Sequence, residues 1–345
     1  MNKKRVLIFA VMLAVLCLLV YLQFRTWKKF DWATFRSTTE HVAKLNLLAG
    51  IALTYLAYVM RALRWRIFLK PVCETTTKRL MAPQLIGFSA LALLGRAGEM
   101  IRPYIIAKKE RLTFTSQIAV WGVERIFDMG AFALMLAVSF LSPDLQRLRF
   151  YHQLREFAFL LLLLVLGLVI GAVVVQLSGE RVGNFLHDRF AGFAPRFAHH
   201  LREKIRSFSA GLATIQDIGS ALQLIAISIF MWLLIALAYY AITHAYPGRL
   251  STLSLSEQVV LMGSSMVGSM LQLPAVGGGQ QVAAIAMLNS GFGVEKELAV
   301  SCGILIWAIT FMSVVPAGLL LARHEHLSIR AVAEAEEKEA ALASE

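Results

Sequence analysis

Three ionisable residues, Glu124, Arg125 and Asp128, lie in the middle of the otherwise apolar run 114–141. On a helix the two carboxylates lie one turn apart on one face, and Arg125 can reach Asp128 three residues later. An ionised side chain at membrane depth costs ~2.5–3.5 kcal/mol, so this group needs either partners or a function. The two carboxylates could serve as a general acid and base, but no nucleophile motif accompanies them. We therefore expect a protein that is not an enzyme and has no catalytic residues.

A second charged group, Arg96, Glu99 and Arg102, lies in the apolar stretch 80–106, which glycines interrupt. This group carries one excess positive charge and the first carries one excess negative charge, so packing them together neutralises both. We expect Arg96 or Arg102 to pair with Glu124. Two interpretations remain open: the charges only hold the two segments together, or the arginines also present planar donors to a phosphate group.

The other interrupted apolar stretch, 259–292, contains glycines and neutral polar residues but no charge. Its centre is a run of three glycines and two glutamines, which are candidate headgroup contacts: Gly277, Gly278, Gly279, Gln280 and Gln281. A helix that begins near Gln280 would aim the positive end of its dipole into the membrane interior, where it suits an anion. Alternatively, the glycines only allow helices to pack closely.

The elements that must position these residues are membrane spans. The chain has 345 residues, of which 58% are hydrophobic and only 16% are charged, whereas soluble domains contain about 25% charged residues. Apolar runs long enough to cross a hydrocarbon core of ~30 Å occur at residues 6–22, 45–60, 114–141, 157–177, 218–245 and 298–322. The sequence therefore predicts an all-α, polytopic integral membrane helix bundle with about six full spans, the first of them uncleaved.

The stretches 80–106 and 259–292 are predicted to form re-entrant hairpins or pairs of short spans, because broken backbone at membrane depth must be buried in protein or line a wet cavity. The order span, span, broken unit, span occurs over residues 5–141 and again over 157–322. Three full spans separate the copies, so the second copy would be inverted. Paired broken segments of this kind indicate a transporter's binding site, although any eight-helix bundle can be divided in this way.

The basic residues follow the predicted spans. The formal net charge is +12, but these residues lie beside apolar runs, which favours membrane orientation and anionic lipid over nucleic acid. Their distribution predicts cytoplasmic termini and places Arg61 and Arg64 at the cytoplasmic mouth, where they would gather anionic lipid. The connector 178–216 has the pattern of an interfacial amphipathic helix. Residues 1–327 would then form one transmembrane domain, followed by a polar tail at 328–345.

The sequence offers no metal or cofactor site. Its three cysteines and eight histidines show neither a disulfide framework nor a ligand spacing that recurs. A nucleotide-binding motif is also absent from the sequence, so an ATP-driven pump is not expected. We expect neither a metal nor a cofactor.

Four motifs occur in a characteristic order. They are Arg61-Ala-Leu-Arg64-Trp65, Leu94-Gly-Arg96-Ala-Gly98-Glu99-Met-Ile-Arg102-Pro103, Glu124-Arg125-Ile-Phe-Asp128 and the proline- and glycine-rich hinge at 274–281. Over nearly the whole chain they resemble the lysylphosphatidylglycerol synthase transmembrane family, also called flippase-like domain proteins, whose module forms the flippase half of the multiple peptide resistance factor. We expect this chain to lack that factor's aminoacyl-transferase domain. The hinge departs from the family pattern, in which a glutamate follows the glycines.

The resemblance implies translocation of an anionic phospholipid or a polyprenyl-type lipid across the cytoplasmic membrane of a prokaryote. Headgroups would cross a polar path between the two broken units while acyl chains stay in lipid. The partners would be membrane lipids with anionic headgroups. The alternative is a non-transporting scaffold or an accessory subunit of a lipid-modifying enzyme. The candidate substrate-binding residues are Arg61, Arg64, Arg96, Glu99, Arg102, Glu124, Arg125, Asp128 and the glycine–glutamine run 277–281.

Overall fold

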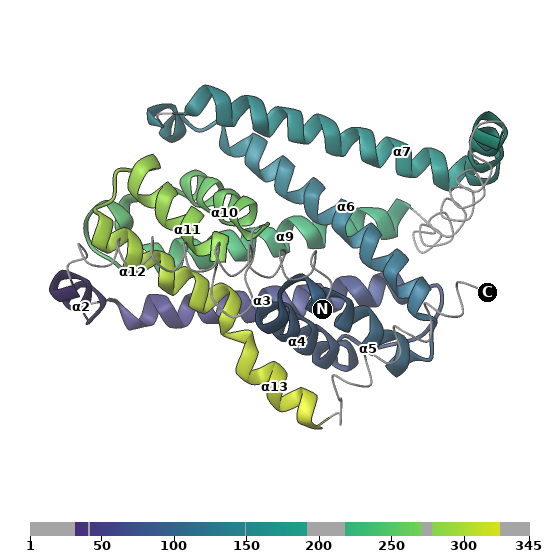
Figure 1. Cartoon of the computed structure of the whole chain (residues 1–345), viewed down its shortest axis with the longest axis horizontal. Helices are drawn as coiled ribbons and strands as arrows, with labels where there is room; N and C mark the ends of the chain where they lie inside the picture. The colour runs from purple at the N-terminus through teal and green to yellow at the C-terminus, as the bar shows by residue number, and fades with distance from the viewer. Residues whose placement is uncertain (1–31, 41, 149, 192–217, 271–277, 325–345) are drawn as a thin grey trace, which may run out of the picture.

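The computed structural model describes residues 32–324, with gaps at 41, 149, 192–217 and 271–277 (Figure 1). These residues form helices joined by turns, and no strand occurs among them. The helices that are long and apolar enough to cross a membrane are Lys44–Leu69, Tyr151–Gly171, Gly219–Thr243 and Lys296–His324. The predicted all-α membrane bundle is therefore confirmed, whereas the count of six spans stays a prediction. The predicted first span, 6–22, and the tail, 328–345, lie outside the described residues.

Two long helices pack along each other: α3 (Lys44–Leu69) and α9 (Ile218–Thr243). Near one end of the pair, a Cβ atom on Gly50 would lie 3.0 Å from the Ile242 side chain. Near the other end, Arg64 Nη1 donates to the Ser228 hydroxyl at 3.0 Å. These two contacts run in opposite directions along the sequence, so the helices are antiparallel. The small residue at position 50 lets the two backbones approach closely, as is common between membrane helices.

The first broken unit is a helical hairpin. It consists of α4 (Thr77–Leu94), the 3-10 turn η1 (Gly95–Met100) and α5 (Ile101–Glu110). The turn begins at Gly95, whose φ of 67° lies in the left-handed region that favours glycine. Gly98 then packs directly on the backbone of Ala90. At the open end Arg79 and Glu110 form an ion pair at 2.9 Å. The start of α4 and the end of α5 therefore lie on the same side of the bundle.

The depth of this hairpin favours the re-entrant alternative over a pair of spans. The rings of Tyr58 on α3 and Phe88 on α4 lie 5.1 Å apart between centroids, which fixes how far α4 extends along its antiparallel neighbour. At 1.5 Å per residue, the hairpin tip at Leu94 stops roughly 12 Å short of the first residue of α3, Lys44. The turn η1 is thus enclosed by the bundle rather than placed at its far end.

The second broken unit has the same design. It consists of α10 (Leu255–Ser269), α11 (Gly278–Ala286) and the π-helical turn η4 (Met287–Gly291). Gly268 lies directly on the carbonyl of Gly279, so α10 could not carry a larger residue at position 268 without moving. α11 begins at Gly278, two residues before the predicted start at Gln280. Gly277 lies outside the described residues.

The two helices that follow the first hairpin are α6 (Phe114–Ser139) and α7 (Tyr151–Ala191). In Figure 1 α7 runs along the outside of the bundle beside α6. α7 continues unbroken from the predicted span 157–177 to Ala191, through the first part of the predicted connector 178–216. A lone glycine such as Gly179 costs a helix only about 1 kcal/mol, so it does not end one. Residues 192–217 of the connector lie outside the described residues.

The last long helix closes the bundle. It is built from α12 (Lys296–Trp307), the π-helical turn η5 (Ala308–Met312) and α13 (Val314–His324), with the short helix α2 (Trp32–Glu40) packed against α12. Ser89 on α4 donates to the Val314 carbonyl on α13 at 3.0 Å. Likewise, Gly263 on α10 lies against Phe132 on α6. The first hairpin therefore packs on α13, the last helix described, and the second hairpin packs on α6, the helix that follows the first hairpin. The helices α3 and α9 lie between the two hairpins (Figure 1).

Candidate functional site

A network of buried charges joins α3, α5 and α6. At its centre Arg64 Nη2 lies 2.6 Å from Glu124 Oε1, and Arg64 Nη1 lies 2.6 Å from Asp128 Oδ1. The side chains of Arg64 and Glu124 are both 0% exposed. The two carboxylates stand one turn apart on α6, as the i,i+4 spacing predicts, and one guanidinium group bridges them.

Arg102 on α5 completes the coordination of Glu124. Its Nη1 donates to Glu124 Oε1 at 3.2 Å and its Nη2 makes a short contact with Glu124 Oε2. Gln84 on α4 accepts a further bond from Arg102 at 3.1 Å. Gly87 lies directly beneath Arg102, where a Cβ atom would collide with the arginine side chain. The predicted ion pair between the first broken unit and Glu124 is therefore present, and Arg102 forms it.

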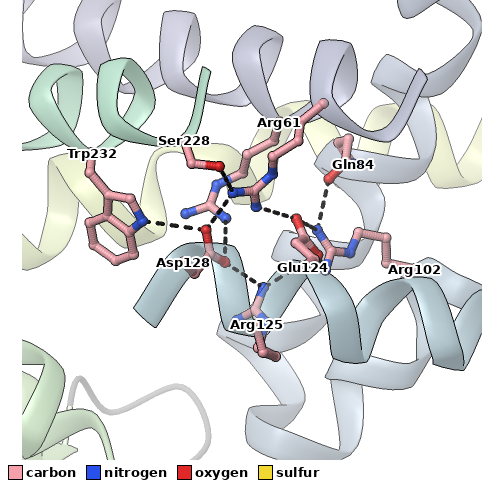
Figure 2. Close-up of polar contacts among 9 residues, drawn as sticks. Arg61, Gln84, Arg102, Glu124, Arg125, Asp128, Ser228 and Trp232 are labelled. Atoms are coloured by element: carbon pink, nitrogen blue, oxygen red, sulfur yellow. Dashed lines mark hydrogen bonds and ion pairs between the residues drawn. The ribbon is translucent and has the colours of Figure 1, made fainter. Parts of the chain in front are cut away.

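The second carboxylate, Asp128, collects donors from its own helix and from α3 and α9. Arg125 Nη2 lies 3.1 Å from Asp128 Oδ2, which is the predicted i,i+3 pair, and Arg61 Nη1 lies 3.8 Å from the same oxygen. From α9, Trp232 Nε1 donates to Asp128 Oδ1 at 3.3 Å. Figure 2 shows the resulting chain of contacts, which runs from Trp232 at one end to Arg102 at the other. Arg125 also approaches Glu124 Oε2 at 3.4 Å, so it touches both acids.

Aromatic rings separate the like charges. The guanidinium groups of Arg61 and Arg102 lie 4.8 Å and 5.2 Å from the ring centre of Phe88. Arg125 lies 5.7 Å from the ring of Trp121. The negative face of an aromatic ring attracts a cation, and more strongly where water is excluded. Phe88 thus stabilises two arginines whose mutual repulsion would otherwise oppose packing.

The network carries an excess of positive charge. Among the residues whose side chains the structure describes, Arg61, Arg64, Arg102 and Arg125 pair with the carboxylates of Glu124 and Asp128, and Glu99 adds one more negative charge beside Arg125. The acids lie ~15 Å and ~21 Å along α6, a helix ~39 Å long, so the charges are near the middle of a membrane-length element. An uncompensated positive charge at this depth is costly. The excess therefore favours binding of an anion.

A cavity of about 330 Å³ lies where this network meets the second hairpin. Its walls include Glu99 beyond the tip of α4, Arg125 on α6, Tyr239 on α9, and Ser265, Ser269 and Gln280 from the second hairpin. A narrow cavity of about 20 Å³, lined by Arg102, adjoins it and shares Glu99 and Arg125. The Arg125 side chain is 38% exposed. Arg125 is therefore the most exposed arginine of the network, and it lines both cavities.

The predicted site residues lie in different places: some are buried in the network, some line the cavity, and some are outside what the structure describes. Arg61 and Arg64 were predicted at the cytoplasmic mouth, but both are buried in the network, because the face of α3 that carries them packs against α6 and α9. Glu99 and Gln280 meet at the larger cavity. Gln281 is the half-buried neighbour of Gln280, and Gly278 and Gly279 form the first turn of α11. The side chain of Arg96 and all of Gly277 lie outside what the structure describes.

Several polar residues of the site were not predicted. They are Gln84, Ser228, Trp232, Tyr239, Ser265 and Ser269. The Tyr239 hydroxyl lies within reach of Ser265, Gln280 and Thr310. One signal for part of this set was available in the sequence: Ser265 and Ser269 lie four residues apart around Gly268, which places two hydroxyls on one face of an apolar helix.

Comparison with known proteins agrees with this architecture. The family described as lysylphosphatidylglycerol synthase TM region matches residues 6–318. A UPF0104 membrane protein from Methanothermobacter thermautotrophicus is 22% identical over 289 residues, covering 79% of this chain and 83% of the relative. The apolar helices and the family match together make the chain a multi-pass membrane protein. The resemblance inferred from the motifs is confirmed, and the chain belongs to the lysylphosphatidylglycerol synthase transmembrane-region family.

Proposed function

We propose that this protein is a membrane lipid translocase that moves an anionic phospholipid or polyprenyl-type lipid across the cytoplasmic membrane of a prokaryote. The observation that carries the proposal is the position of Arg125. This residue belongs to a buried network with excess positive charge, and it also lines the cavity between the two hairpins. A phosphate group in the cavity would meet a cation there without first breaking into the buried part of the network.

The dimensions of the cavity suit a headgroup. Its volume of about 330 Å³ is at the lower end of the ~300–1,000 Å³ range of small-molecule sites, so it would take a headgroup while the acyl chains remain in lipid. Arg125 provides a charged donor on one side. On the other side Tyr239, Ser269 and Gln280 provide neutral hydrogen-bonding groups. This division suits a phosphate that carries an uncharged polar substituent.

The charged residues divide into two roles in this proposal. Arg64 and Arg102 are buried and directed at carboxylates, so they hold α3, α5 and α6 together. Arg125 and Glu99 line the cavity and would contact the headgroup or tune its charge. In this proposal some charged residues only hold the helices together, as Arg64 and Arg102 do, whereas others meet the headgroup, as Arg125 and Glu99 would.

The arrangement of helices offers a route for alternating exposure. We infer that residues 5–141 and 157–322 form an inverted repeat, with α3 equivalent to α9 and each hairpin equivalent to the other. Antiparallel packing of α3 on α9 and the reciprocal packing of hairpins on closing helices are what an inverted repeat requires. Exchange of the two halves between equivalent conformations would open the cavity first to one leaflet and then to the other. The proposed topology places both termini in the cytoplasm.

Reconstitution tests the function directly. The purified chain is placed in liposomes with fluorescent phosphatidylglycerol, and a membrane-impermeant reductant is added outside. A translocase makes the inner-leaflet fluorophore accessible, whereas protein-free liposomes protect it. Absence of translocation for phosphatidylglycerol and for a polyprenyl phosphate would favour the alternative, a non-transporting scaffold or accessory subunit of a lipid-modifying enzyme.

A further inference from the structure

A second polar cavity, of about 950 Å³, lies between α3 and α9. Its walls include Leu63, Arg66, Ile67 and Lys70 from α3 and Gln223 and Ile227 from α9. The α3 residues follow the i, i+3, i+4, i+7 spacing of one helix face. At 100° per residue this face points about 140° away from the face that carries Arg61 and Arg64. The cavity therefore lies on a different face of α3 from the charge network.

The walls of this cavity change from polar to apolar along α3. Lys70 lies at the end of the helix, where Thr75 and Thr76 of the following loop close the cavity. Leu63 lies about 10 Å deeper along the helix axis, with Ile227 on the facing helix. The cavity is thus cationic and hydroxyl-lined at one end and apolar at the other. An amphiphile with its headgroup at the end of a membrane-spanning helix has the same polarity.

The charged end is not neutralised by its surroundings. Within the part of the chain that the structure describes, neither Arg66 nor Lys70 forms an ion pair. The nearby acid Glu110 is engaged by Arg79 at 2.9 Å and by the Thr75 hydroxyl at 3.1 Å. Among the lining residues that the structure describes, two are cations, Arg66 and Lys70, and one is an acid, Glu74. A net positive charge remains to be balanced by a bound anion.

The cavity opens beside surfaces that face lipid. On α9 the side chains next to the cavity, Leu222 and Ile225, are 60% and 45% exposed, as expected for residues in contact with acyl chains. A lipid could therefore enter this cavity sideways from its own leaflet. Its phosphate would reach Arg66 and Lys70 while its chains lie along Ile227.

We propose that the α3–α9 cavity binds an anionic phospholipid, with the phosphate on Arg66 and Lys70 and an acyl chain along Leu63 and Ile227. This site is distinct from the cavity lined by Arg125. Its occupancy does not depend on translocation, so either proposal can fail without the other. Loss of both cations should weaken binding roughly 30-fold, from about 1 kcal/mol for each charge near an anionic lipid.

Cys73 provides a reporter, because this half-buried free thiol lines the same cavity. Burial raises the pKa of the Cys73 thiol, with a further contribution from Glu110, so labelling is best followed at mildly alkaline pH, where more thiolate forms. The full chain carrying C17S and C302S, purified in mild detergent, is treated with a maleimide. Dioleoyl phosphatidylglycerol should slow the labelling of Cys73 several-fold, and dioleoyl phosphatidylcholine and inorganic phosphate should not.

The variant R66Q/K70Q should lose this protection, whereas K108Q, which removes an exposed lysine near the same end of the bundle, should keep it. Native mass spectrometry of the same samples should show that the double variant retains fewer phosphatidylglycerol molecules than wild type. Protection by phosphatidylcholine to the same extent, or by phosphate alone, would overturn the assignment. So would full protection and unchanged lipid retention in a folded double variant.

Discussion

Arg64 and Glu124 are both excluded from solvent, and their charged atoms lie 2.6 Å apart. This contact joins α3 to α6 and sits at the centre of a network that also contains the cavity-lining Arg125. A buried pair of this kind adds little stability compared with apolar packing, but removing one partner leaves an uncompensated charge. The pair therefore fixes how α3 lies against α6, and with it the geometry of the site.

Replacing Arg64 should destabilise the protein severely. R64A removes the buried donor that lies 2.6 Å from both Glu124 and Asp128, and loss of one partner of a buried pair costs ~3–5 kcal/mol. R66A is the matched control, because Arg66 lies two residues away on the exposed side of the same helix and surface changes cost about 0.5 kcal/mol or less. Thermal unfolding in detergent, followed by tryptophan fluorescence, compares them. Equal stability of the two variants would show that the network is not structural.

Gly87 should tolerate no side chain. A Cβ atom at this position meets Arg102, so G87A must push α5 away from α4, and such overpacking costs ~1–3 kcal/mol. The control is G122A on α6, where nothing lies within 4 Å of the new Cβ atom. Helix propensity alone makes that change neutral or favourable by up to about 1 kcal/mol. Thermal unfolding midpoints measure both variants, and a G87A protein as stable as G122A would contradict the close approach.

The charge pattern was sufficient to predict part of the site. Opposite net charges in two apolar stretches predicted that Arg96 or Arg102 meets Glu124, and in the structure Arg102 forms this ion pair. The role of Arg64 was missed, because arginines at the end of a span usually orient it. Its burial depends on the rotation of α3, which packing sets. A usable signal existed: Gly50, Ala57 and Arg64, all buried, recur every seven residues, so the face that begins with small residues continues into Arg64.

The sequence predicted where the helices of the two hairpins are interrupted, but not how the chain folds back at each interruption. Glycines around Gly95 and Gly278 indicated where helices end, and the structure has the breaks there. The direction of each return depends on contacts between residues distant in sequence, such as Gly268 with Gly279. An apolar run predicts the part of a helix that lies within lipid and not the whole helix, and α7 continues beyond the predicted span 157–177 to Ala191.

The neutral glutamine in the cavity should matter for anionic headgroups. Q280E places a carboxylate on the wall that faces Arg125. This carboxylate competes with the phosphate group for Arg125 and repels the phosphate group. Translocation of phosphatidylglycerol should slow and should recover as the pH falls through the pKa of the new carboxyl, about 4.3 for an unperturbed glutamate. Wild type, measured in the same liposomes, should lack this recovery. The wild-type rate for Q280E at neutral pH would remove Gln280 from the path.

Glu99 should limit the affinity of the cavity for anions. Its carboxylate lines the same space as Arg125, so E99Q raises the net charge of the lining by one. Binding of short-chain phosphatidylglycerol, measured by titration calorimetry in detergent, should tighten relative to wild type. The control E156Q removes an exposed acid of α7 and should leave affinity unchanged. Weaker binding by E99Q would indicate that Glu99 holds a cationic group instead.

The rate at which R125Q moves phosphatidylglycerol across liposome membranes tests the central claim most directly. Arg125 contacts the network and lines the cavity, so its loss should lower the rate about tenfold or more, as expected for a hydrogen bond to a charged group. R155Q, which removes an exposed arginine of α7, should keep the wild-type rate. Translocation at the wild-type rate by a folded R125Q protein would contradict the proposal that headgroups cross between the two hairpins.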